Sequence, residues 1–74
     1  MCMKKEALSK TFGKNVRAAR SKQGLTQEKL AEKCGLDFRQ IGFIERGETN
    51  PTLQTIQKIS KGLNQTVNQL LRDS

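Results

Sequence analysis

The stretch TQEKLAEKCGLDFRQIGFIERG, residues 26–47, contains two short helical patterns joined at a glycine. Thr26 is a typical cap for a helix over about residues 26–33, and Asp37 for the next helix, over about residues 37–46. Gly35 stands at the turn, and the small Ala31 lets the two backbones approach. Apolar residues at helical spacing would hold the pair on a core: Leu30, Cys34, Leu36, Ile41 and Ile44. The stretch therefore predicts a helix-turn-helix.

Helical patterns continue on both sides of this pair. Upstream, Leu8, Phe12, Val16 and Ala19 recur every three or four residues and predict a helix over residues 6–22, which Gly24 ends. With this helix counted as the first, residues 26–33 form the second and residues 37–46 the third. We expect Asp37 and Gln40 to form a capping box at the start of the third helix.

Downstream, Leu53, Ile56, Ile59 and Leu63 predict a fourth helix over about residues 52–61, which Gly62 interrupts. Thr66 and Gln69 form a capping box that opens a fifth. Because no segment alternates with the period of a strand, we expect an all-α fold with five short helices. Residues 1–74 would make one domain, with residues 1–5 as a flexible basic tail.

Composition limits the possible functions. Fourteen Lys and Arg against seven Asp and Glu give a formal charge of +7, which suits a polyanion such as nucleic acid or an anionic membrane, although charge also aids solubility. The chain contains neither histidine nor tyrosine, so an enzyme using a neutral-pH base is disfavoured, and so is a metal or cofactor site. A chain this short leaves little room for a small-molecule substrate cavity.

Two cysteines do not make a disulfide framework, and no apolar run suggests a membrane span or signal peptide, so a cytoplasmic location is expected. The basic residues 4–22 lack the density of Trp, Phe and Leu that is typical of helices lying on membranes.

The residues also resemble a known family. Together with RAARSKQGLTQ before it and IERGETNPTL after it, the helix pair is similar to the lambda-repressor-like, or XRE-family, helix-turn-helix regulators over about residues 12–71. The short members look closest, including controller proteins of restriction-modification systems and small phage or plasmid repressors. The resemblance implies a transcriptional regulator that binds double-stranded DNA, with the third helix in the major groove and the second across the backbone.

The third helix has an unusual exposed face. At about 100° per residue, Arg39, Gly42, Phe43 and Arg46 point away from Ile41. In such a regulator Arg39 would reach guanine O6 and N7 while Phe43 touches thymine methyl groups. Alternatively, Phe43 packs back on the second helix or meets another protein. Phe38, at the edge of the core stripe, has both interpretations.

The resemblance implies further roles. Gln27 would meet a phosphate at the start of the second helix, unless it is an ordinary solvated residue, and Arg20 would pair with Glu45 for structural reasons. Relatives often carry polar residues where this chain has Phe38 and Phe43, so the target sequence does not transfer. The predicted DNA-contact set is Arg17, Gln27, Phe38, Arg39, Gln40, Gly42, Phe43, Arg46, Asn50 and Thr52.

Dimerisation is expected because one recognition helix reads only a few base pairs. The end of the chain carries more apolar side chains than a five-helix core requires, and the surplus predicts a homodimer interface on a palindromic operator. The predicted interface residues are Ile59, Leu63, Val67, Leu70 and Leu71. In the alternative, all five belong to the core. A second function also stays open, a protein-interaction module such as an antitoxin that mainly grips a protein partner.

Overall fold

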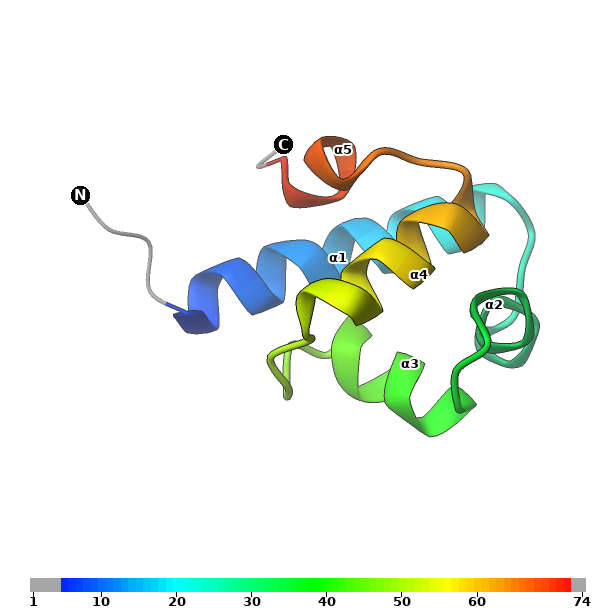
Figure 1. The fold of residues 1–74 in the computed structure, drawn as a ribbon, viewed down its shortest axis with the longest axis horizontal. Coiled ribbons are helices and arrows are strands. Elements are labelled where there is room, and N and C mark those ends of the chain that lie inside the picture. Colours follow the sequence, from blue (N-terminus) through cyan, green and yellow to red (C-terminus); the bar gives the residue numbers. More distant parts are fainter. Residues whose placement is uncertain (1–4, 73–74) are drawn as a thin grey trace.

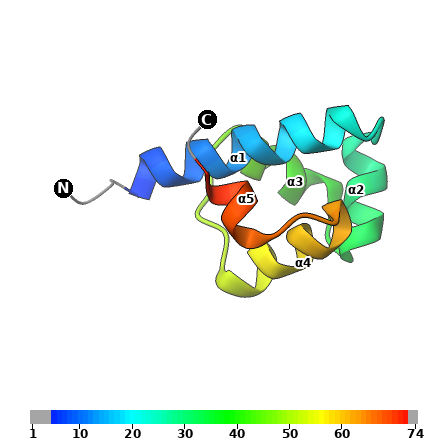
Figure 2. The ribbon, with the colours of Figure 1, turned by 90° about the horizontal axis from the view of Figure 1, so that it is seen from above.

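The computed structural model describes residues 5–72, with side chains from residue 9 onward, and this part of the chain is all helical. Its helices are α1 (Lys5–Lys22), α2 (Gln27–Cys34), α3 (Phe38–Glu45), α4 (Leu53–Leu63) and α5 (Val67–Leu71). In Figure 1, α1 and α4 form the middle of the molecule, α3 lies below them and α5 above. Figure 2, seen from above, shows α5 lying across α1 and α4. The prediction of an all-α fold is confirmed.

Threonine caps set three of the helix starts. The hydroxyls of Thr26, Thr52 and Thr66 accept hydrogen bonds from backbone N–H groups in the first turns of α2, α4 and α5. At α5 the capping box between Thr66 and Gln69 is complete in both directions, as predicted. These starts could be predicted because each depends on residues three positions apart.

The start of α3 differs from the prediction. The Asp37 carboxylate caps the helix, but it accepts from the N–H of Arg39 at 2.9 Å rather than from that of Gln40. The expected capping box with Gln40 is therefore wrong, because the carboxylate reaches the second N–H of the helix instead of the third.

Gly62 does not interrupt α4. The helix continues to Leu63 and ends at Asn64, which takes the left-handed conformation (φ 55°) and donates its N–H to the carbonyl groups of Ser60 and Lys61. A Cβ atom at Gly62 would overlap the sulfur of Cys34 in α2. The glycine is thus explained by the close approach of α2 and α4. Burial of Cys34 there raises the pKa of its thiol, which suits a packing role.

The core corrects the predicted dimer interface. Three of the five predicted residues, Ile59, Leu63 and Leu70, are almost completely inaccessible, packed with Phe12 and Val16 from α1. They cannot contact a second chain while the domain is folded, so assigning them to a surface was wrong. Val67 and Leu71 are only partly buried. The alternative that these residues complete the core holds for those three.

Polar bonds hold the later helices on α1. The Asn15 amide donates to the carbonyl groups of Leu70 and Arg72, each at 2.7 Å, and the Gln23 amide donates to that of Leu63 at 2.7 Å. These bonds satisfy carbonyl groups at the ends of α4 and α5. Of the predicted tail, Lys5 already lies in α1, while residues 1–4 and the Leu8 side chain lie outside what the structure describes.

Candidate nucleic-acid interface

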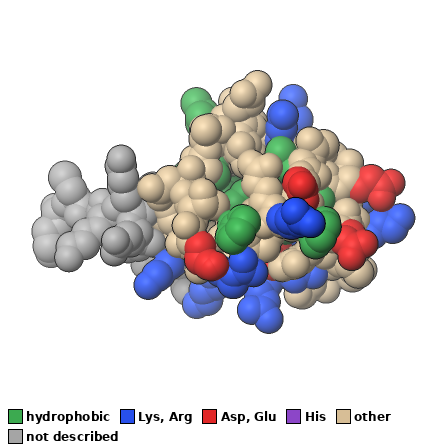
Figure 3. Space-filling view, turned by 90° about the horizontal axis from the view of Figure 1, so that it is seen from below, with side chains coloured by type: hydrophobic (Ala, Val, Ile, Leu, Met, Phe, Trp, Pro, Cys, Tyr) green, Lys and Arg blue, Asp and Glu red, His purple; other side chains and the backbone are tan. Residues whose placement is uncertain are grey.

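Helix α3 divides into a buried and an exposed face. Ile41 and Ile44 are buried in the core, whereas Phe38, Arg39 and Phe43 are exposed, as the helical spacing predicts. Figure 3 views the molecule from below, the side on which α3 lies, and shows hydrophobic side chains among Lys and Arg side chains on this face. Exposed phenylalanines beside arginines give a surface that can make both apolar and charge-assisted contacts.

Phe43 stands on this surface rather than in the core, with 48% of its area exposed. The guanidinium carbon of Arg46 lies 5.2 Å from the centre of its ring, a cation–π distance. Phe43 therefore does not lie in the core. Phe38 is similar: 47% of its area is exposed, and the Arg39 guanidinium carbon lies 5.9 Å from its ring centre.

Gly42 is buried, although its place on α3 predicts that it is exposed. It is buried beneath two longer side chains: a Cβ atom there would lie 3.2 Å from Nη1 of Arg46 and 3.8 Å from Oε1 of Gln27. Its expected direct contact with DNA is corrected accordingly, because those side chains cover it. Its effect is to leave room in which the Arg46 guanidinium can lie.

A buried carboxylate joins the helices that flank this surface. Glu45 has only 3% of its side-chain area exposed and accepts from Nε of Arg20 at 2.6 Å and from Nη2 at 3.1 Å. The predicted pairing of Arg20 with Glu45 is confirmed. Arg20 also donates from Nη1 to the Leu25 carbonyl at 2.8 Å.

Gln27 belongs to the same network. Its Nε2 donates to Oε1 of Glu45 at 3.0 Å, and its side chain is partly buried at the start of α2. Gln27 is thus bound to the protein and is not an ordinary solvated residue. The bond fixes the amide beside α3. In the first turn of α2 the Lys29 N–H is bound by the Thr26 hydroxyl, whereas the N–H groups of Gln27 and Glu28 have no partner within the helix.

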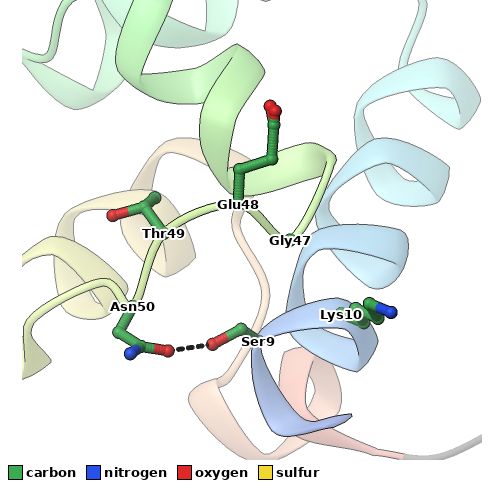
Figure 4. A pocket seen from close by; sticks show the side chains of 6 residues that line it. All are labelled: Ser9, Lys10, Gly47, Glu48, Thr49 and Asn50. Carbon is green, nitrogen blue, oxygen red and sulfur yellow. Dashed lines mark hydrogen bonds between the residues drawn. The ribbon is translucent and has the colours of Figure 1, made fainter. Parts of the chain in front are cut away.

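The remaining predicted contacts come from α1, α3 and the segment between α3 and α4. Gln40 is half-buried on α3, and Arg17 is exposed on α1. The Thr52 hydroxyl already caps α4, accepting from the Thr55 N–H at 3.1 Å. Asn50 lies in the loop between α3 and α4, where its side-chain oxygen accepts a hydrogen bond from the Ser9 hydroxyl of α1 (Figure 4). Asn50 and Thr52 therefore have structural bonds that the sequence did not predict.

Two surface residues were missed by sequence reasoning. Glu48 bonds to Nε of Arg46 at 2.8 and 3.1 Å through its two carboxylate oxygens, and its only signal in the sequence was an opposite charge two positions away. Leu53, counted with the apolar stripe of α4, has 69% of its area exposed. The sequence signal for its exposure was its position in the first turn of α4.

Membrane-spanning and metal-binding features are both missing from residues 5–72. No helix there is both long and apolar enough to cross a lipid bilayer. In the same part of the chain, no group of three or more His, Cys, Asp or Glu side chains is placed to hold a metal ion.

The family model for helix-turn-helix domains, HTH_3, matches residues 16–70, which include all of α2, α3 and α4. The chain belongs to the HTH_3 family. Control protein C.SmaI of Serratia marcescens is 42% identical over 64 residues, which are 86% of this chain and 76% of that protein. Control protein C.BamHI of Bacillus amyloliquefaciens is 51% identical over 53 residues, 70% of this chain and 65% of that protein.

Solved structures agree with this HTH_3 assignment. The restriction-modification controller protein C.AhdI of Aeromonas hydrophila superposes with a TM-score of 0.81 at 37% identity, covering 84% of this chain and 94% of that one. The chain is therefore a DNA-binding transcriptional regulator whose helix-turn-helix is formed by α2 and α3. The resemblance inferred from residues 12–71 is confirmed.

Proposed function

We propose that this HTH_3 regulator reads a palindromic DNA operator as a homodimer, with α3 of each copy in the major groove. The observation that carries the proposal is the exposed face of α3, where Arg39 and Phe43 stand outward while Ile41 and Ile44 bind the helix to the core. A helix attached along one face and free along the other can enter a groove without losing its packing.

Roles follow from the chemistry of that face. Arg39 reads a guanine through O6 and N7, and Phe43 selects thymine by contact with its methyl group. Arg46 and the start of α2 at Gln27 contact backbone phosphates, which position the domain. Phe38, stacked with Arg39, restricts the directions from which that guanidinium can approach a base.

The dimer uses a different surface from the one that the sequence suggested. Leu53 is largely exposed, and Ile56, one turn later, is partly exposed on the same side of α4. Val67 and Leu71 of α5 are the two members of the predicted set that remain available. In Figure 1, α4 lies between α3 and α5, whereas in Figure 2 it lies along one side of the molecule, opposite α1. A two-fold axis beside α4 that runs in the direction from α5 to α3 therefore turns the α3 faces of both copies to the same side.

The biological role proposed is that of a restriction-modification controller protein working in the cytoplasm. Control proteins C.SmaI and C.BamHI are at least 42% identical to this chain over the matched residues.

Selection of bound duplexes from a random DNA pool tests this proposal. We expect a consensus with two inverted half-sites whose centres are about 34 Å apart, one turn of the double helix. A single, non-repeated half-site would overturn the homodimer. Absence of any consensus, with weak binding that ignores salt, would instead favour a module that binds a protein partner.

A further inference from the structure

Glu48 lies at the edge of the DNA-facing surface, where an acid opposes the phosphate backbone, yet it has a defined partner. Its two carboxylate oxygens accept from the single Nε–H of Arg46 at 2.8 and 3.1 Å. In Figure 4 the Glu48 side chain points away from Ser9 and Asn50, which bind each other on the other side of the loop. The Glu48 side chain therefore binds Arg46 and does not take part in the Ser9–Asn50 bond of the loop.

Three neighbours together define where the Arg46 guanidinium lies. Glu48 binds its Nε, the Phe43 ring lies 5.2 Å from its central carbon, and the missing side chain of Gly42 leaves the space beside Nη1. The bond to Glu48 uses Nε and leaves the two Nη groups available for DNA. The long Arg46 side chain is thus limited to a small part of its conformational range in the DNA-free protein.

We propose that Glu48 is a positioning residue for DNA recognition, which holds Arg46 on the Phe43 ring so that Arg46 meets a backbone phosphate in one register of α3 only. The inference rests on the proposed placement of α3 in the major groove. Phosphate contacts carry no sequence information by themselves, but they fix register. A guanidinium held in one place contacts a phosphate only when α3 is aligned with the operator. A freely rotating guanidinium can contact a phosphate in any register, and therefore adds affinity for every duplex.

This arrangement predicts an effect on the ratio of specific to random binding. If Glu48 merely repelled phosphates, removing its charge would strengthen binding to every duplex equally, and the ratio would stay constant. If Glu48 positions Arg46, removal of the Glu48 carboxylate strengthens binding to random DNA more than binding to the operator, and the ratio of operator to random affinity falls. The exposed pair adds only about 0–1 kcal/mol to folding as a surface salt bridge, so variants at position 48 should fold.

The experiment measures affinities for two duplexes, the consensus selected by the unmutated protein and a scrambled duplex of equal composition. Glu48→Ala should lower the ratio of the two affinities roughly twofold to fivefold, the most that an exposed ion pair of up to about 1 kcal/mol can supply. Glu48→Gln, which keeps one acceptor oxygen, should lower it less. Glu32→Gln is the matched control, because it removes the same charge from an exposed acid that pairs only distantly with Lys29.

A double-mutant cycle with Arg46→Ala identifies the route of the effect. In the Arg46→Ala background, Glu48→Ala should leave the ratio unchanged, because the group that it positions is gone. The NMR signal of the Arg46 Nε–H in DNA-free protein should move in Glu48→Gln and stay in place in Glu32→Gln. Gly42→Ala, which crowds Nη1 without a backbone clash, should lower the ratio in the same direction as Glu48→Ala.

The possible failures are distinguishable. If the unmutated protein selects a consensus but Glu48→Ala keeps the affinity ratio, or lowers it equally without Arg46, the positioning role is wrong and the proposed function stands. If the unmutated protein selects no consensus at all, the major-groove proposal fails and the role of Glu48 fails with it.

Discussion

Nε2 of Gln27, the first residue of α2, lies 3.0 Å from Oε1 of Glu45, the last residue of α3, and donates a hydrogen bond to it. The same carboxylate accepts two bonds from Arg20 of α1. One buried acid therefore connects α1, α2 and α3, the helices that set the position of the exposed face of α3. The angle between α2 and α3 depends on a polar centre as well as on apolar packing.

Arg20→Ala should be strongly destabilising. It would leave Glu45 buried without its charged partner, which costs about 3–5 kcal/mol in comparable pairs. Urea denaturation at neutral pH measures the loss. Lys29→Ala is the control, because its pair with Glu32 spans 3.9 Å on the surface and should change stability by less than about 1 kcal/mol. Equal, small losses for both variants would show that the Glu45 network has no major structural role.

Gln27→Ala and Arg46→Ala should each weaken binding to both the consensus and the random duplex, because both side chains are assigned to phosphates. The loss for Arg46→Ala should be larger on the consensus, where the positioned guanidinium meets its phosphate. Only Arg46 carries charge, so only its removal should reduce the slope of log affinity against log salt, by about 0.9. Fluorescence anisotropy at several salt concentrations gives both quantities. A loss confined to the consensus duplex would contradict the phosphate assignment of that residue.

Leu53→Glu should give a folded monomer with poor operator affinity, since the side chain is exposed in one copy and proposed to meet the second. Leu70→Glu is the contrasting variant: it places a charge in the core and should unfold the domain. Sedimentation and thermal melting separate the two effects. If Leu53→Glu still forms a dimer on DNA, the α4 surface is not the interface.

Arg39→Ala should relax the preference for one G·C pair in the consensus. A good bidentate contact discriminates by about 1–3 kcal/mol, which corresponds to roughly tenfold to a hundredfold in relative affinity. The variant should melt like the unmutated protein, because Arg39 is exposed. Competition among duplexes that differ at single base pairs locates the effect. A uniform loss over all of these duplexes would assign Arg39 to a phosphate instead.

Phe43→Ala should act at a thymine, with a smaller effect than Arg39→Ala because no charge is left unpaired. The difference between the two proteins should shrink when that thymine is replaced by uracil, which lacks the methyl group. Stability should change little, since nearly half of the ring is already exposed. A large fall in melting temperature, with no response to uracil, would show that the ring stabilises the fold rather than reading DNA.

Much of the fold could be predicted because helices are local structures. Helical spacing, the caps at Thr26 and Thr66 and the left-handed turn at Gly35 are set by neighbours within a few residues. The exposed face of α3 followed from the same periodicity, which alone places Arg39 and Phe43 outward. The candidate site was predictable to the extent that it consists of one helix face.

The errors share a physical cause, which is contact between distant segments. Gly62 was interpreted as a helix breaker, but it accommodates the Cys34 sulfur across the α2–α4 contact. Ile59, Leu63 and Leu70 were counted as surplus because their number gave no measure of how much core α1 and α2 would cover. Gly42 was assigned to DNA although Arg46 and Gln27 fold over it.

The sequence by itself determined which segments are helical, where most of them begin and which face of α3 is exposed, because these depend on bonds and side-chain directions within one or two turns. Tertiary structure alone decided which apolar residues remain at the surface, Leu53 rather than Leu70, and which charges meet, Arg46 with Glu48. Periodicity gives the direction of a side chain from its own helix. What covers that side chain depends on how the other helices pack, and their positions are set by the whole core at once.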